Sequence, residues 1–104
     1  MIEFYPVCKF TDIGFAEGKA VEIEGKRIAI FNVFGKLYAI ENVCPHMSAT
    51  LHDGTVEGRS VICRLHFWEI SLTDGKCITD PAYCVATFPV KVEKGIVKVG
   101  IEKS

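Results

Sequence analysis

Two short pairs of metal-binding residues dominate the middle of the chain. Cys44 and His46 form a Cys-x-His pair, Cys63 and His66 form a Cys-x-x-His pair, and sixteen residues separate the two pairs. Two thiols and two imidazoles are the donor set of either a tetrahedral zinc ion or a two-iron, two-sulfide cluster. If the four side chains converge, the chain must fold so that two loop tips meet.

The order of the ligands favours the cluster over zinc. Zinc sites built from two Cys and two His usually take both Cys from one pair and both His from the other. Here each loop supplies one Cys and one His. This mixed pairing lets two parallel loop tips reach two irons at once, with Cys on one iron and His on the other.

This arrangement resembles the Rieske family, whose signature is C-x-H, a gap of this length and then C-x-x-H. Similar residues recur at Asp53-Gly54, Val56-Glu57-Gly58, Thr73-Asp74-Gly75-Lys76 and Phe88-Pro89-Val90. The resemblance runs from about Lys19 to the C-terminus. It implies one [2Fe–2S] cluster held by Cys44, His46, Cys63 and His66.

The second loop departs from the commonest family form, which has Pro after the second Cys and Gly after the second His. This chain has Arg64 and Phe67 at those positions. The segment from Cys63 to Trp68 is similar to that of the Rieske ferredoxin component of toluene monooxygenases, as is the Tyr83-Cys84 region. The resemblance therefore implies a ferredoxin of a multicomponent aromatic oxygenase system.

High-potential relatives add a disulfide between the two loops and two hydroxyl groups aimed at the cluster sulfurs. The matching positions here are Ala49 and Leu65 for the disulfide, and Trp68 and Ile70 for the hydroxyls. None of these side chains can supply the missing group. We therefore expect a midpoint potential near the low end of the range of about −150 to +300 mV for such clusters.

The remaining chain predicts an all-β fold. Segments 19–24, 27–33 and 37–40 alternate in polarity and are rich in β-branched residues, which predicts a meander of three half-buried antiparallel strands. Pro6 confines a strand over 3–8 to a sheet edge. Hairpins are expected around Gly58, Gly75 and Gly95, with an irregular loop over 79–86. The resemblance implies a Rieske-like β-sandwich over 1–104 with a cluster-binding part at about 42–85.

Composition narrows the class of protein. A chain of 104 residues that is 49% apolar suits one domain, and a net charge of −1 argues against nucleic acid as a partner. No apolar run is long enough for a spanning helix, so we expect a cytoplasmic protein. Cys8, Cys77 and Cys84 are expected to be packed thiols in a reducing compartment, with a Cys77–Cys84 disulfide as the alternative.

The function predicted from these features is single-electron transfer. The resemblance implies a monomer that contacts a flavoprotein reductase and a terminal oxygenase briefly, through an apolar rim around the ligands, and it implies no catalysis of its own. Expected rim residues are Pro45, Met47, Phe67, Pro81 and Tyr83, with Trp68 turned inward and His52 an exposed loop residue. Two alternatives stay open: the Rieske-like small subunit of a nitrite reductase, and a zinc-binding interaction module.

Overall fold

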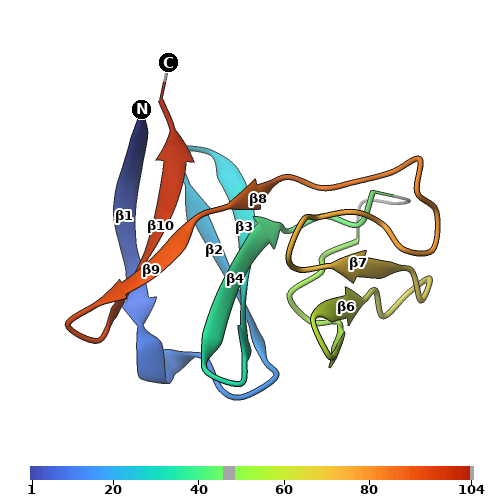
Figure 1. The fold of residues 1–104 in the computed structure, drawn as a ribbon, viewed down its shortest axis with the longest axis horizontal. Coiled ribbons are helices and arrows are strands. Elements are labelled where there is room, and N and C mark those ends of the chain that lie inside the picture. Colours follow the sequence, from blue (N-terminus) through green and yellow to red (C-terminus); the bar gives the residue numbers. More distant parts are fainter. Residues whose placement is uncertain (46–48, 104) are drawn as a thin grey trace.

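A computed structural model describes residues 1–45 and 49–103 of the chain (Figure 1). These residues form three antiparallel sheets and one short 3-10 helix, η1 (Phe10–Asp12). The all-β prediction is confirmed. Within the described ranges no helix is long and apolar enough to cross a membrane.

The central sheet contains the predicted meander. Its strands are β2 (Gly18–Ile23), β3 (Lys26–Val33), β4 (Lys36–Glu41) and the short β8 (Thr87–Phe88), in that order. β8 was not predicted as a separate strand, because a two-residue segment is too short to show a strand period. It pairs with β4 at Ala39 and Ile40.

Two-residue turns set the register of the hairpins. Glu24 and Gly25 both have positive φ, and so do Phe34 and Gly35, which is the backbone of the turns that match the twist of antiparallel strands. In each turn Gly occupies the second position. The predicted segments 19–24 and 27–33 place the first reversal at Gly25 and Lys26, and it lies one residue earlier because Lys26 already pairs with Ile23.

The outer sheet joins the two ends of the described chain. Its order is β1 (Ile2–Lys9), β10 (Ile96–Glu102) and β9 (Val90–Glu93). β1 is an edge strand, as Pro6 predicted, and its register slips between Pro6 and Cys8. Proline has no N–H to donate, so an edge with an irregularity is where a strand accepts it.

The outer and central sheets enclose one apolar core. Ile28 and Ile30 of β3 contact this core from one side, and Val97 and Val99 of β10 from the other, all with no exposed surface. The opposite face of β3 carries Phe31, which belongs to a second core. The expectation that β3 is half-buried was therefore wrong, because the central sheet is a middle layer covered on both sides.

A third, small sheet covers that second face. It consists of β5 (Thr55–Glu57), β6 (Ser60–Ile62) and β7 (Glu69–Ser71), and Figure 1 shows β6 and β7 at the end of the molecule away from β1. The hairpin predicted around Gly58 is present. The hairpin predicted around Gly75 is reduced to an isolated bridge between Ile70 and Cys77. From there to the start of β8 the chain is irregular, apart from one bridge between Lys76 and Cys84.

Candidate metal centre

The loop between β4 and β5 contains the predicted ligands Cys44 and His46, and we call it the first ligand loop. It is anchored by a buried side-chain amide. Asn42 Oδ1 accepts hydrogen bonds from the backbone N–H groups of Leu51 (2.8 Å) and His52 (2.9 Å). The N–H of Cys44 donates to the carbonyl of Ala49 at 2.7 Å, which joins two described residues of the loop. Asn42 was not among the predicted site residues, although an Asn at the point where the strand pattern stops is a signal of a side-chain-stabilised loop.

His52 belongs to the same anchor. Its ring Nδ1 lies 3.1 Å from Nδ2 of Asn42, and the residue is partly buried. Since Oδ1 of Asn42 already accepts two backbone bonds, the Asn42 amide nitrogen is the donor and His52 Nδ1 is the acceptor. The expectation of an exposed loop residue was wrong, because this histidine is a structural partner of Asn42.

The second ligand loop is a tight turn between β6 and β7. The N–H of Phe67 donates to the carbonyl of Cys63, and the N–H of Cys63 donates to the carbonyl of Trp68, both at 2.8 Å. Phe67 has a φ of 59°, in the left-handed region. The commonest form of the family that this sequence resembles has Gly at the position of Phe67. The turn here therefore has a backbone conformation that favours glycine but carries a bulky side chain.

The two cysteines are buried, whereas the side chains on either side of His66 are exposed. Cys44 is 2% exposed and Cys63 is fully buried, whereas Leu65 and Phe67 on the second loop are 59% and 75% exposed. Between them lies His66, a partly exposed residue whose Nδ1 atom is enclosed by protein. The ring thus directs one nitrogen inward, on the same loop that buries a thiol.

These donors fit an iron–sulfur cluster. The thiols of Cys44 and Cys63 are buried, and the Nδ1 atom of His66 faces inward. Backbone hydrogen bonds within each loop hold these residues in place. In the part of the chain that the structure describes, no three His, Cys, Asp or Glu side chains gather around one point. The fourth predicted ligand, His46, lies outside the described residues, as does the predicted rim residue Met47.

The irregular loop over 79–86 contacts the second ligand loop through aromatic rings. Trp68 and Tyr83 meet edge to face, with 5.4 Å between ring centroids and 62° between planes. Trp68 also packs against the second core, so its predicted inward position is confirmed. Tyr83 is 42% exposed and Pro81 is exposed, which agrees with their predicted places in the rim.

The other cysteines are free thiols. Cys77 is 1% exposed and its Sγ accepts a hydrogen bond from the N–H of Asp80 at 3.4 Å. Cys8 is partly exposed, and burial raises the pKa of its thiol, although Lys19 acts in the opposite direction. Cys84 is exposed, so the packed position expected for it was wrong, and the structure contains no Cys77–Cys84 disulfide.

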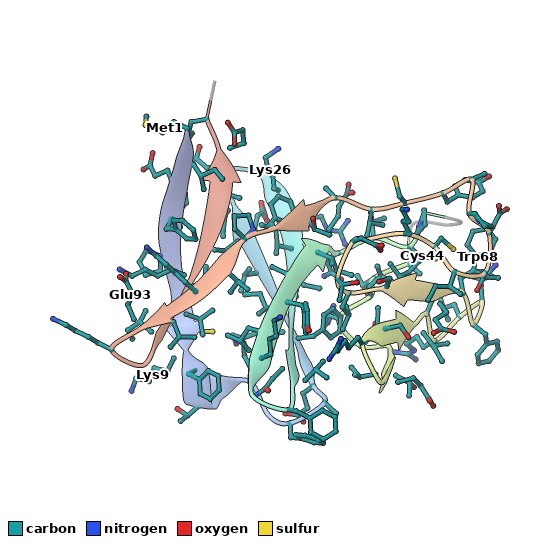
Figure 2. All side chains as sticks on the ribbon, viewed as in Figure 1. Met1, Lys9, Lys26, Cys44, Trp68 and Glu93 are labelled. Carbon is teal, nitrogen blue, oxygen red and sulfur yellow. The ribbon has the colours of Figure 1, made fainter. Side chains whose placement is uncertain are left out.

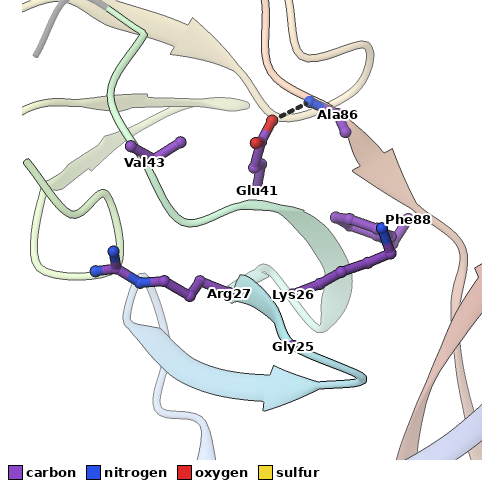
Figure 3. Close-up of a pocket in the computed structure, with 7 residues that line it drawn as sticks. All are labelled: Gly25, Lys26, Arg27, Glu41, Val43, Ala86 and Phe88. Carbon is purple, nitrogen blue, oxygen red and sulfur yellow. Dashed lines mark hydrogen bonds between the residues drawn. The ribbon is translucent and has the colours of Figure 1, made fainter. Parts of the chain in front are cut away.

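Glu41 links the first ligand loop to the end of the 79–86 loop. Its carboxylate accepts a hydrogen bond from the N–H of Ala86 at 3.0 Å, and its own N–H donates to the Ala86 carbonyl at 2.8 Å. Figure 3 shows this contact beside a hollow that also involves Arg27 and Val43. Figure 2 places Cys44 and Trp68 at the end of the molecule that contains β6 and β7, and Met1 and Glu93 at the other end.

A comparison with protein families identifies the family to which the chain belongs. The model of the Rieske [2Fe-2S] domain matches residues 3–89. The chain belongs to the Rieske [2Fe–2S] family. A Rieske domain carries one [2Fe–2S] cluster, so both the predicted family and the predicted cofactor are confirmed, and the zinc-module alternative is set aside.

Curated relatives are ferredoxin components. The naphthalene 1,2-dioxygenase ferredoxin component of Pseudomonas putida is 34% identical over 93 residues, which cover 88% of this chain and 89% of the relative. The alkene monooxygenase ferredoxin component of Xanthobacter autotrophicus is 31% identical over 102 residues, which cover 97% of this chain and 84% of the relative.

Solved structures confirm the Rieske fold. A complex of reduced oxygenase and oxidised ferredoxin in carbazole 1,9a-dioxygenase contains a chain of 28% identity and TM-score 0.87, with coverage of 97% of this chain and 95% of that one. A Mycobacterium tuberculosis structure, titled as the small subunit of an NADH-dependent nitrite reductase, has a TM-score of 0.95, and the match covers 100% of this chain and 99% of that chain. Its identity is 24%, so this likeness shows the fold alone.

Proposed function

We propose that this Rieske protein is the ferredoxin of an oxygenase system, which carries single electrons from a flavoprotein reductase to a terminal oxygenase. The observation that carries the proposal is the near full-length match to ferredoxin components of a dioxygenase and of a monooxygenase system. Those relatives are electron carriers, which agrees with the prediction that the chain has no catalysis of its own. The carbazole dioxygenase complex supports a terminal oxygenase as partner.

The ligand assignment is part of this proposal. Cys44 and Cys63 would hold one iron, and His46 and His66 would hold the other. Buried thiols at both loop bases and the enclosed Nδ1 of His66 support it. When bound, the cluster accepts one electron, and imidazole ligands make it easier to reduce than an all-Cys cluster.

The chain's own residues shield the sulfur ligands from water and provide a path for the electron to the surface. Burial of the two cysteines keeps water from the sulfur ligands, while His66 lies between the exposed side chains of Leu65 and Phe67. An imidazole bound through Nδ1 leaves the other side of its ring toward the surface, which shortens the path to a partner. Small, partly apolar interfaces suit brief encounters.

We also propose a midpoint potential near the low end of the family range. Trp68 and Ile70 stand where high-potential relatives place hydroxyl groups, and Ala49 and Leu65 where those relatives have a disulfide. Without hydroxyl hydrogen bonds, the negative charge of the reduced cluster is less stabilised.

Domain organisation and location complete the proposal. We propose one domain over residues 1–104, in which about 42–85 binds the cluster and the two larger sheets form the base. The protein is proposed to be a cytoplasmic monomer. A nitrite reductase small subunit remains the second candidate, since a solved structure titled as the small subunit of a nitrite reductase is 28% identical to this chain, with a TM-score of 0.84.

The first experiment is an EPR spectrum of dithionite-reduced protein, with iron and acid-labile sulfide counted on the same sample. We expect two irons and two sulfides per chain and an average g below that of all-Cys clusters. His66→Ala should abolish this signal, while His52→Gln, on the other loop, should keep it. Zinc without sulfide would refute the ligand assignment. Failure of the reduced protein to pass electrons to any Rieske or diiron oxygenase would refute the carrier function.

A further inference from the structure

A polar contact at the surface joins the two ligand loops. Arg64, between Cys63 and His66 in the sequence, places its Nη1 atom 3.1 Å from Oδ2 of Asp53 on the first loop. The other carboxylate oxygen of Asp53 accepts a hydrogen bond from Oγ1 of Thr50 at 3.0 Å. One carboxylate therefore binds across the loops with one oxygen and within the first loop with the other.

This contact, which we call the polar clasp (Arg64, Asp53 and Thr50), spans a specific gap. Its three residues line a hollow together with Ala49 and Leu65. Those two positions match the cysteines that form the inter-loop disulfide in high-potential relatives. The clasp thus lies where a covalent crosslink would connect the same two loops.

The clasp is charged at neutral pH. Partial burial of Asp53 works against ionisation, but the hydrogen bonds from Arg64 and Thr50 outweigh it and lower the pKa of Asp53 below its ordinary value. The side chain of Arg64 is 61% exposed and that of Asp53 is 33% exposed. Water and salt therefore reach the pair, and its strength should depend on ionic strength.

We propose that the polar clasp holds the two ligand loops together and slows the loss of the bound cluster, as an ionic counterpart of the disulfide. Arg64 and Asp53 are positioning residues that act through the loops and do not bind iron. This inference rests on the proposed ligand set, since it assigns the cluster to these two loops.

The size of the effect follows from the exposure of the pair. Exposed ion pairs contribute little to global stability. Cluster release, however, requires only that the loops separate, which is a local opening that breaks this contact. We expect removal of either partner to speed cluster loss by about two- to fivefold, the range that such pairs support.

The experiment measures the decay of visible absorbance of the cluster-loaded protein in excess chelator, at low and at high salt. Arg64→Gln and Asp53→Asn should each decay about two- to fivefold faster than the wild type at low salt. The double variant should decay no faster than either single variant, because both remove the same contact. High salt should bring the wild type close to the variants and leave the variants unchanged.

Midpoint potentials separate the clasp from a general loosening of the fold. Arg64→Gln leaves the Asp53 anion beside the cluster and should lower the potential, whereas Asp53→Asn leaves the Arg64 cation and should raise it. The two variants thus shift the potential in opposite directions while they shift cluster loss in the same direction. A loosened fold would not produce opposite signs.

A remote ion pair provides the control. Lys98 Nζ lies 2.9 Å from Oε1 of Glu93 on the outer sheet, with similar exposure, and Lys98→Gln should change neither readout. Additive effects of Arg64→Gln and Asp53→Asn, or a wild-type decay that does not respond to salt, would overturn the clasp. The wild-type measurement stands even if a variant fails to load, and a protein that never binds iron would instead overturn the proposed function.

Discussion

The backbone of Phe67 offers a test of how this loop is built. Its φ is 59° and its side chain is 75% exposed. A left-handed backbone costs a non-glycine residue about 1–2 kcal/mol, and glycine escapes this cost but loses about 0.5–1 kcal/mol through greater freedom when unfolded. The quarter of the ring that is covered is worth about 0.5 kcal/mol at the usual value for a buried Phe.

Two variants isolate the backbone contribution. Phe67→Ala loses the covered part of the ring and keeps the left-handed cost, so it should be destabilised by about 0.5 kcal/mol. Phe67→Gly loses the same ring but is relieved of the strain. The free energy of unfolding of the glycine variant should therefore exceed that of the alanine variant by about 0.5–1 kcal/mol, or about 2–8 °C in apparent melting temperature for a domain of this size.

The assay is thermal unfolding of the cluster-loaded protein followed by circular dichroism at one heating rate. Lys94, exposed and with a φ of 51° in the β9–β10 turn, is the control, and its Gly and Ala variants should differ by the same amount. If the alanine variant at Phe67 melts at or above the glycine variant while the Lys94 pair keeps the expected order, the reasoning about this turn is refuted.

Three further outcomes are expected. Asn42→Ala leaves two backbone N–H groups of the first ligand loop without their acceptor, and should lower the free energy of unfolding by about 2–4 kcal/mol, read as a lower apparent melting temperature and faster cluster loss. Gly75→Ala should be severely destabilising by the same assay, because φ is 76° and a Cβ would approach the Val85 carbonyl oxygen to 2.1 Å. Because the pKa of Asp53 is lowered in the folded protein, its stabilising effect is present above the ordinary value of 3.8 and is lost as pH falls through the lowered pKa. The melting temperature of Asp53→Asn should approach that of the wild type in that acid range, and a constant difference down to about pH 2 would contradict the link to Arg64.

Local patterns predicted the positions of the central-sheet strands well. Alternation over β2 and β4 and the X-Gly turns were sufficient, because a two-residue turn and a period of two are properties of a few adjacent residues. β8 was missed as a separate strand since its two residues take their conformation from β4. The burial of β3 on both faces also escaped prediction, since the third sheet that covers it is distant in the sequence.

The candidate site divides in the same way. The spacing of Cys44, Cys63 and His66 predicted the family, which is confirmed, because ligand type and order are properties of the sequence. The assignment of these side chains as ligands stays a prediction. The partners of Asn42 and the contact between Arg64 and Asp53 could not be predicted. Each depends on where two loops meet, which no local period encodes.

By itself the sequence determined the chemistry of this protein: two Cys and two His in an order that suits two irons, on a chain with the alternation of antiparallel strands. Only the tertiary structure decided how the loops are held. Hydrogen bonds from one buried amide, a strained turn at Phe67 and an ionic contact between Arg64 and Asp53 set the loop positions. The reason is that donor identity is a property of single residues, whereas the separation of two loops depends on contacts between segments that the fold brings together.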